Sequence, residues 1–418
     1  MRRYDSYKDS GVEWLGDVPS HWELKRLKQL FVEKKHKQNL SLNCGAISFG
    51  KVIEKDDDKV TEATKRSYQE VLKGEFLINP LNLNYDLISL RIALSEIDVV
   101  VSAGYIVLKA KQIINKKYFS YLLHRYDVAY MKLLGSGVRQ TINYGHISDS
   151  ILVAPPLSEQ QKIAQFLDDK TAKIDQAVDL AEKQIALLKE HKQILIQNAV
   201  TRGLNPDVPL KDSGVEWLGD LPSHWDVQRS KFIFKKIERK VNEEDQIVTC
   251  FRDGQVTLRA NRRTEGFTNA LKEHGYQGIR KGDLVIHAMD AFAGAIGISD
   301  SDGKATPVYS VCLPRDKQKI DVYFYAYYLR NLALSGFISS LAKGIRERST
   351  DFRYADFAEL LLPIPPYLEQ QKIADYLDKQ TAKIDQAIAL KTAHIEKLKE
   401  YKSVLINDVV TGKVRVSV

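Results

Sequence analysis

The chain has 418 residues and a net charge of +8, with 44% hydrophobic and 28% charged residues, as in ordinary soluble globular proteins of about two to four domains. We expect a cytoplasmic protein without a signal peptide or a membrane helix, because no apolar run approaches the roughly 18–20 residues of a membrane span. The three cysteines lie far apart, which argues against a zinc site or a disulfide framework. The excess of Lys and Arg weakly favours a partner with a phosphate backbone.

The first recognisable element is a short leader that the chain contains twice. Residues 8–22 and 211–225 are identical at fourteen of fifteen positions. A second repeat follows a Pro-Pro pair in each half, where residues 159–180 and 369–390 share sixteen of 22 positions. Repeats this strong indicate a tandem duplication. Each copy consists of a leader, a variable middle, a Pro-Pro hinge and a long helix.

The variable middles, residues 23–152 and 226–362, share a plan but little sequence. A Lys-Gly turn followed by a strand-like run occurs in residues 68–80 and again in residues 276–288. Mixed strands and helices in about 130 residues predict a compact α/β (α+β) module that is used twice. The matching buried strands are expected at 99–109 and 305–314, and the matching helices at 118–134 and 323–338.

A long helix is predicted after each Pro-Pro hinge, since Pro-Pro disfavours helix just upstream and suits helix entry just downstream. Ser158 and Gln161 fit a capping box at the first helix start, whereas Tyr367 lacks this chemistry in the second copy. Gly203 and Gly412 are expected to end the helices.

Apolar residues recur in both helices with 4-3-4-3 spacing, which favours helix–helix pairing over two unrelated surface helices. Lys192 interrupts the first seam, and Lys391 and Lys402 interrupt the second. About 44 helical residues form a rod of roughly 65 Å. Antiparallel pairing would give a nearly closed ring with pseudo-twofold symmetry. The seam residues are Ile174, Val178, Ala181, Ile185, Leu188, Leu195 and Ala199, then Ile384, Ile388, Ile395, Leu398, Leu405 and Val409.

These patterns divide the chain into four predicted parts. Residues 1–156 form a recognition domain with its leader, and residues 157–203 form a central helical spacer. Residues 204–366 form the second recognition domain with the repeated leader, and residues 367–418 form the C-terminal helical spacer.

Residue types that read bases are found in the loops of both middles. Arg can pair bidentately with guanine, and Asn or Gln with adenine, in the DNA major groove. Arg139 and Arg346 stand out because each belongs to a Gly-x-Arg loop. The alternative is that most of these residues are solvated loop polars. The candidates are Lys65, Arg66, Asn79, Asn82, Asn84, Arg139 and Gln140 in the first middle, and Arg252, Arg259, Asn261, Arg262, Arg263, Arg346 and Arg348 in the second.

Motifs that would indicate catalysis are not convincing. Residues 364–367 resemble the Asn-Pro-Pro-Tyr of adenine methyltransferases, but Ile364 cannot accept a hydrogen bond from the adenine amino group. No Gly-Lys-Ser/Thr phosphate loop occurs, and Asp56–Lys59 fits a solvated loop better than a metal site. The sequence therefore predicts a protein that is not an enzyme.

Together these parts resemble the specificity subunit of type I restriction-modification systems. The resemblance rests on the leader EWLG…PSHW, the PPL-EQ-KI junction with TAKID beyond it, and the Gly-x-Arg loop before each hinge, and it covers essentially the whole chain. It implies two target recognition domains joined by two long antiparallel coiled-coil helices. Each domain would read one half of a bipartite DNA site, and the helices would set the gap.

The resemblance also implies the partners: double-stranded DNA, two methyltransferase subunits and restriction subunits. It implies no cofactor in this subunit, with S-adenosylmethionine used by the methyltransferase subunits and ATP and Mg²⁺ by the restriction subunits. A rod of roughly 65 Å corresponds to about 19 base pairs along the DNA axis. A stand-alone DNA-binding regulator or architectural protein on the same scaffold remains the alternative. A scaffold that binds only proteins is disfavoured by the charge and the Arg-rich loops.

Overall fold

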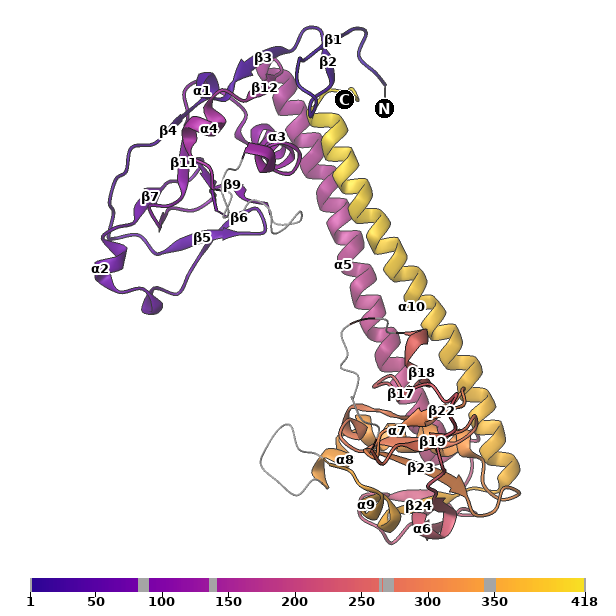
Figure 1. The fold of residues 1–418 in the computed structure, drawn as a ribbon. Helices are drawn as coiled ribbons and strands as arrows, with labels where there is room; N and C mark the ends of the chain where they lie inside the picture. Colours follow the sequence, from indigo (N-terminus) through magenta and orange to yellow (C-terminus); the bar gives the residue numbers. More distant parts are fainter. Residues whose placement is uncertain are drawn as a thin grey trace. The chain divides into compact units, whose positions relative to one another are not determined.

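The computed structural model describes residues 2–81, 90–134, 141–262, 265, 274–341 and 351–416. The chain forms two compact units (Figure 1). Unit 1 comprises Met1–Ala181 and Ala393–Val418, and unit 2 comprises Glu182–Thr392. Each unit holds one leader, one body of strands and short helices, and about half of each of two long helices.

Unit 1 is built around a four-stranded antiparallel sheet in the order β4 (Phe31–Glu33), β11 (Ile106–Ala110), β8 (Phe76–Ile78) and β9 (Ile92–Leu94). Smaller antiparallel pairs surround the sheet. They are β1 (Tyr7–Asp9) with β2 (Asp17–Pro19), β3 (Glu23–Arg26) with β12 (Ile151–Ala154), β5 (Gly45–Ser48) with β6 (Lys51–Glu54), and β7 (Gln69–Val71) with β10 (Val99–Val101). The short helical elements are α1 (Leu27–Leu30), η1 (Asp57–Lys59), α2 (Glu62–Lys65), α3 (Lys116–Ala129), η2 (Met131–Leu134) and α4 (Tyr144–Ser148).

Unit 2 repeats this plan strand for strand. Its four-stranded antiparallel sheet has the order β16 (Phe234–Lys236), β23 (Tyr309–Pro314), β20 (Leu284–His287) and β21 (Ile296–Ile298). The smaller pairs are β13 (Leu210–Asp212) with β14 (Asp220–Pro222), β15 (Asp226–Arg229) with β24 (Leu361–Ile364), β17 (Val248–Cys250) with β18 (Val256–Leu258), and β19 (Gln277–Ile279) with β22 (Gly303–Ala305). The short helical elements are α6 (Ser230–Ile233), η3 (Arg259–Asn261), η4 (Ala291–Ala293), α7 (Val322–Leu334), α8 (Phe337–Ser340) and α9 (Tyr354–Glu359).

The predicted strand at residues 99–109 is in fact two strands in different sheets. The backbone turns between β10 and β11, where the amide of Tyr105 donates to the carbonyl of Ser102 at 3.1 Å. Small and polar residues at this point allow the turn, and an uninterrupted apolar pattern on both sides concealed it. The duplication nevertheless extends from the sequence to the whole topology of the bodies.

A central helix packs on each sheet through aromatic side chains. In unit 1, Phe119 of α3 meets Phe31 edge-on with ring centroids 5.6 Å apart, and in unit 2, Tyr325 of α7 meets Phe234 in the same way at 5.2 Å. All four side chains are buried. Such edge-to-face pairs add to the stability that burial of the rings provides.

The long helices α5 (Leu157–Arg202) and α10 (Tyr367–Val410) are joined to the bodies by the repeated glutamine after each hinge. Gln160 accepts a hydrogen bond from the amide of Asn115 at 2.9 Å and donates to the carbonyl of Pro155 at 2.8 Å. Gln370 forms the equivalent bonds with Asp321 and Pro365, at 2.8 and 2.7 Å. Asn115 and Asp321 are the N-caps of α3 and α7. The hinge, the cap of the central helix and the long helix are therefore fixed together in both units.

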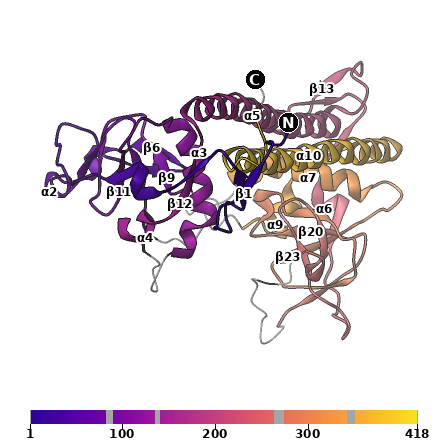
Figure 2. The same ribbon diagram turned by 90° about the horizontal axis from the view of Figure 1, so that it is seen from above.

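The two long helices pair with opposite directions in each unit, and Figure 1 and Figure 2 both show them side by side. In unit 1, Lys402 of α10 lies 2.6 Å from Asp175 of α5, and in unit 2, Lys192 of α5 lies 2.6 Å from Asp385 of α10. The predicted seam residues are buried or half-buried, while most of their neighbours are exposed. The predicted antiparallel coiled coil is confirmed. Two of the interrupting lysines, Lys192 and Lys402, form ion pairs across it, and the third, Lys391, donates to Oε1 of Gln184 at 2.6 Å.

The helix ends agree only in part with the prediction. Gly203 and Gly412 follow α5 and α10 with φ of 75° and 78°, as expected of glycine at a helix end. The predicted capping box was wrong, because α5 begins at Leu157 and places Ser158 inside the first turn. The carbonyl of Pro156 already accepts from the amides of Glu159 and Gln160, so the proline itself starts the helix.

No helix in the described ranges has the length and apolar character that crossing a membrane requires.

Candidate nucleic-acid interface

Arginine candidates of unit 2 surround the turn between β17 and β18, Phe251–Gln255. The turn closes through hydrogen bonds from Phe251 to Gln255 at 2.8 Å and from Gly254 to Phe251 at 2.9 Å. It sits directly on the body, because a Cβ atom at Gly294 would lie 2.8 Å from the carbonyl oxygen of Arg252. A turn held this closely presents its side chains in a defined orientation.

Arg252 projects from this turn and is bound by a carboxylate on one edge. Its Nε and Nη2 atoms donate to Oδ1 of Asp290 at 3.2 and 2.8 Å, and its side chain is 67% exposed. The backbone amide of Asp290 donates to Nδ1 of His287 at 3.0 Å. Burial lowers the pKa of His287, so the imidazole is neutral at neutral pH and its Nδ1 acts as the acceptor. Arg252 is thus an exposed guanidinium on a fixed support.

The other described candidates of unit 2 are engaged within the protein. The guanidinium of Arg262 lies 4.2 Å from the ring centroid of Phe251 and also contacts Asp253 at 2.7 Å. Nε of Arg259 donates to the hydroxyl of Thr249 at 3.3 Å, and the Asn261 amide donates to Thr257 at 2.8 Å. These contacts stabilise the hairpin itself.

Unit 1 has a different tip on the same hairpin. The turn between β5 and β6 consists of Phe49 and Gly50, and both have positive φ, 45° and 72°, as a tight two-residue hairpin turn requires. A phenylalanine rarely adopts this conformation, and its side chain is 80% exposed. Phe49 was not among the residues predicted from the sequence. The match between Ser-Phe-Gly here and Cys-Phe-Arg-Asp-Gly in unit 2 is the sequence pattern that could have identified Phe49 as a turn residue.

Of the candidates in unit 1, Lys65 serves the fold. Its ammonium donates to Asp57 at 2.6 Å, and Asp57 also accepts from the amide of Cys44. The hydrogen bond from Lys65 and those from Cys44 lower the pKa of Asp57 to about 2. Arg66 is exposed and pairs with Glu62 one helical turn away at 2.9 Å. Asn79 accepts a hydrogen bond from the amide of Leu81 at 3.1 Å.

The remaining candidates lie outside the described residues, and their contact with DNA stays a prediction. They are Asn82, Asn84, Arg139, Gln140, Arg263, Arg346 and Arg348.

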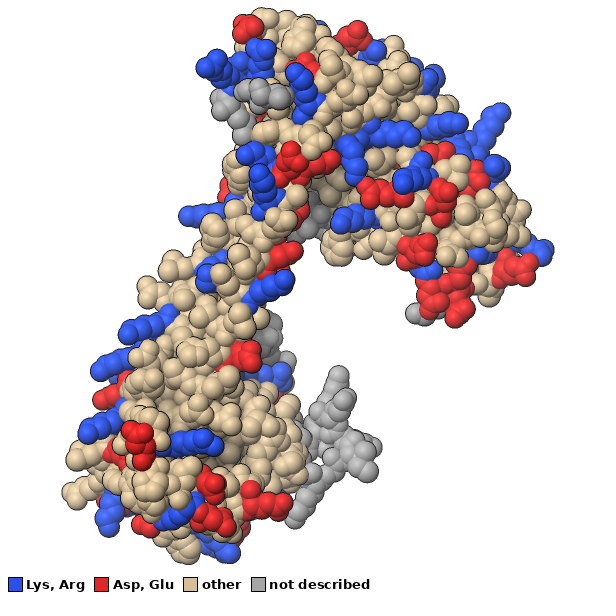
Figure 3. Space-filling view, turned by 180° about the vertical axis from the view of Figure 1, so that it is seen from behind, with Lys and Arg blue, Asp and Glu red and all other residues tan. Residues whose placement is uncertain are grey.

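Charge alone does not locate a binding face. On the face drawn in Figure 3, Lys and Arg are interspersed with Asp and Glu over both bodies and helices. Fixed side chains at the hairpin tips therefore carry more information about recognition than the net charge of +8.

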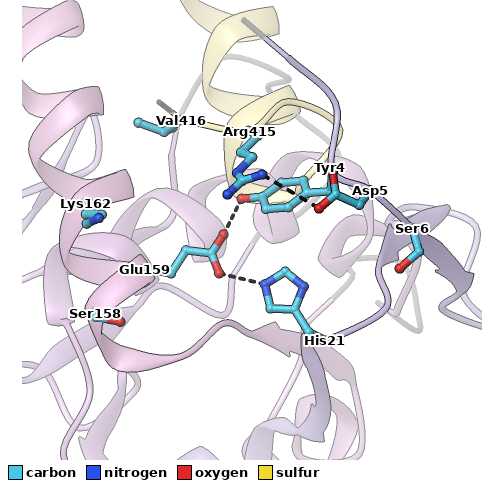
Figure 4. Close-up of a pocket in the computed structure, with 9 residues that line it drawn as sticks. All are labelled: Tyr4, Asp5, Ser6, His21, Ser158, Glu159, Lys162, Arg415 and Val416. Atoms are coloured by element: carbon cyan, nitrogen blue, oxygen red, sulfur yellow. Dashed lines mark hydrogen bonds and ion pairs between the residues drawn. The ribbon is translucent and has the colours of Figure 1, made fainter. Parts of the chain in front are cut away.

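The leader of unit 1 is held against the start of α5 by a single carboxylate, Glu159. Figure 4 shows Glu159 between His21 and Tyr4, with Arg415 beside the Tyr4 ring. Oε2 of Glu159 lies 2.9 Å from Nε2 of His21 and accepts from the indole of Trp22 at 3.2 Å, and Oε1 accepts from the Tyr4 hydroxyl. Burial is the main cause of the raised pKa of Tyr4.

Unit 2 has a smaller version of the same contact. Nε2 of His224 lies 2.8 Å from Oε2 of Glu369 at the start of α10. The repeated His and Glu therefore attach each leader to its helix, which explains why these residues recur in both copies.

The described residues hold no cluster of three or more His, Cys, Asp or Glu side chains that could bind a metal ion. Cys44, Cys250 and Cys312 are all free and buried.

These features define a class of protein: two copies of one mixed body, each presenting a different hairpin tip, attached in the same way to a pair of antiparallel helices. The comparison with known families agrees. The model described as the type I restriction modification DNA specificity domain matches residues 19–189 and 225–400. The chain belongs to this family, and DNA sequence specificity is its function.

One known relative is similar over nearly the whole chain and another over about two thirds of it. A putative type I restriction enzyme MjaX specificity subunit of Methanocaldococcus jannaschii is 22% identical, with 96% of each chain covered. The MjaVIII specificity subunit of the same organism is 28% identical over 63% of this chain and 61% of its own length.

Solved structures share the fold. A chain from a study of the assembly and conformational transition of the type I R-M system superposes with a TM-score of 0.67 and 14% identity, covering 95% of this chain and 99% of its own length. The HsdS subunit of Thermoanaerobacter tengcongensis gives a TM-score of 0.54 and 17% identity, covering 97% and 100%.

Proposed function

We propose that this chain is the non-catalytic recognition subunit of a methyltransferase–endonuclease complex that acts in the cytoplasm. Each unit reads one half of a bipartite DNA site, and α5 and α10 set the gap between the halves. The observation that supports two different half-sites is the pair of hairpin tips, Phe49-Gly50 in unit 1 and Phe251–Gln255 in unit 2. The same strands carry a different chemistry at the point where each turn is exposed.

The leaders support two identical partner subunits. Buried leader residues such as Trp22 and Trp225 must agree because both copies fold in the same way. Packing does not require exposed residues to be the same in the two copies. Glu13 and Asp17 nevertheless recur as Glu216 and Asp220, and all four are exposed. Exposed side chains that are the same in both leaders are explained if the same kind of partner binds each leader. We infer that one methyltransferase subunit binds at each leader.

The chemistry then belongs to the partners. The methyltransferase subunits use S-adenosylmethionine to modify adenine, and the restriction subunits use ATP and Mg²⁺. DNA binding by the assembled complex is expected to weaken as salt increases, because contacts with phosphates release counterions.

Exchange of one recognition segment tests the proposal. Residues 226–362 are replaced by the equivalent segment of a relative, the gene is expressed with its methyltransferase subunits, and the methylated sequences of the host DNA are mapped. One half-site should change while the other half-site and the gap stay the same. A change in both halves would contradict the modular reading. Failure of the chain to co-purify with a methyltransferase subunit would instead favour a stand-alone regulator.

A further inference from the structure

We propose that Arg252 reads a guanine in the half-site of unit 2, and that Asp290 is the positioning residue that holds its guanidinium for this task. The inference deepens the proposed function and rests on it. It assigns to one side chain a base specificity that belongs to unit 2 and has no equivalent in unit 1.

The geometry of the guanidinium carries the proposal. A guanidinium is a planar group with two edges that can each donate two hydrogen bonds. In Arg252 the edge formed by Nε and Nη2 is bound to Asp290. Within the described part of the chain, Nη1 makes no hydrogen bond or ion pair. The edge formed by Nη1 and Nη2 can therefore donate to O6 and N7 of guanine, which is the bidentate pairing that distinguishes guanine in the major groove.

The support under Arg252 reduces the cost of ordering this long side chain. The turn is tied to the body at Gly294, and Gly254 has φ of 89° and lies directly over Arg330 of α7. Any Cβ at Gly254 would lie 2.7 Å from Cδ and Nε of Arg330. The side chain of Asp290 is 33% exposed, and the backbone of Asp290 is held by the hydrogen bond from its amide to Nδ1 of His287 at 3.0 Å. An arginine side chain that is already held in its binding conformation loses less conformational entropy when it binds the base.

Two comparisons within the chain favour Arg252 as the residue that contacts guanine. Arg262 lies in the same hairpin, but its guanidinium is stacked on Phe251 and paired with Asp253, so its donors serve the protein. Unit 1 has the short Phe49-Gly50 turn at the corresponding place, with no arginine. An aromatic tip can stack on a base or contact a thymine methyl group, but it cannot pair with guanine.

The test uses the full chain assembled with its methyltransferase subunits and a panel of DNA duplexes. Each duplex carries one substitution in the methylated site, and affinity is measured at one salt concentration. We expect Arg252→Ala to bind the cognate site about 5- to 100-fold more weakly. It should lose discrimination at one G·C pair of one half-site. Arg252→Lys should also weaken this discrimination, because an ammonium is a point charge without the planar fork of donors that lets Asp290 hold one edge while the other edge meets guanine.

Asp290 is tested by a pair of variants. Asp290→Ala should weaken discrimination at the same G·C pair, and Asp290→Asn, which retains an acceptor oxygen, should restore part of it. Arg229→Ala is the matched control: Arg229 is also an exposed arginine of unit 2 paired with a carboxylate, Glu359, at 3.0 Å. It removes the same charge and should leave discrimination unchanged at every position.

Several results would overturn the proposal. One is a unit 2 half-site without a G·C pair. Another is an equal loss of affinity on all duplexes for Arg252→Ala, which would indicate a phosphate contact. Wild-type discrimination by Arg252→Lys would also overturn it. If Asp290→Ala keeps full discrimination, the positioning role is wrong. A wild-type complex that binds all duplexes equally would refute the proposed function itself, which distinguishes the two failures.

Discussion

The ammonium of Lys402 on α10 lies 2.6 Å from the carboxylate of Asp175 on α5, within the seam of the helix pair. Lys192 and Asp385 form the same contact in unit 2. Polar residues at seam positions specify register at a cost in stability. Lys192 and Lys402, which interrupt the apolar pattern, thus have a structural role that is repeated with the duplication.

We expect Lys192→Leu and Lys402→Leu each to raise the free energy of unfolding by about 1 kcal/mol, since each adds apolar burial to the seam. The variants should also populate additional oligomers or registers, visible by light scattering during gel filtration. Lys397→Leu, at an exposed position of α10, is the control and should add no stability. A Lys402→Leu chain with unchanged stability and a single species would contradict a register-setting role.

The carboxylate of Glu159 should contribute more to stability than its twin Glu369. Glu159 accepts bonds from Tyr4 and Trp22 and contacts His21, whereas Glu369 contacts His224. Glu159→Ala should cost about 1–3 kcal/mol, because buried donors are left unsatisfied. Hydrogen exchange should show faster opening of residues 8–22 in this variant. Glu369→Ala should have a smaller effect on residues 211–225, and equal effects would count against the asymmetry.

The glycines at the ends of the long helices should tolerate alanine differently. Both have positive φ, so alanine costs about 1 kcal/mol or more at either position. At Gly412 the new Cβ would also lie 2.4 Å from Cδ of Pro19 and 2.9 Å from the Trp22 ring, while at Gly203 the nearest atom is the flexible carboxylate of Glu369 at 2.9 Å. Thermal unfolding should show a larger loss for Gly412→Ala. The reverse order would contradict the packing of the leader on the end of α10.

Acid should destabilise the chain through His124 of α3. Burial lowers the pKa of His124 from 6.5 to about 4. Above pH 6.5 the residue is neutral in both the folded and the unfolded chain. Between pH 6.5 and 4 the unfolded chain binds the proton and the folded chain does not, so stability falls, by about 2 kcal/mol at pH 5.

Urea unfolding at pH 7 and pH 5 measures this loss. His124→Gln should reduce the difference between the two pH values, whatever it does to the stability at pH 7. His394→Gln, which removes an exposed histidine of α10, should leave the difference unchanged. An undiminished acid loss in His124→Gln would refute the assignment.

The length of the helix pair should set the gap in the DNA site. α5 has 46 residues, about 70 Å at 1.5 Å per residue. Four residues inserted near Gln197 would add about 6 Å of helix, or about two base pairs. Methylation mapping should show a longer gap between unchanged half-sites. An unchanged gap would rule out the helices as the spacer.

The sequence predicted the architecture well because duplication leaves a direct record in the order of residues. The leaders, the hinges and the seam with its Lys192 and Lys402 interruptions were all readable along the chain, and helical pairing follows from local periodicity. The body was less readable. The turn between β10 and β11 consists of a few small and polar residues between two buried apolar strands, and the apolar pattern on both sides hides the change of direction.

The candidate site was also only partly predictable from the sequence. The sequence by itself determined that the chain holds two similar modules, that arginines gather near residues 252–263, and that a pair of helices accompanies the modules. The tertiary structure alone decided that Asp290 supports Arg252, that Phe251 and Asp253 engage Arg262, and that Lys65 serves Asp57. The physical reason is that the local sequence around a loop arginine is the same whether its donors face solvent or a carboxylate. Only the contacts made by distant strands and turns distinguish a side chain available to a ligand from one already used by the fold.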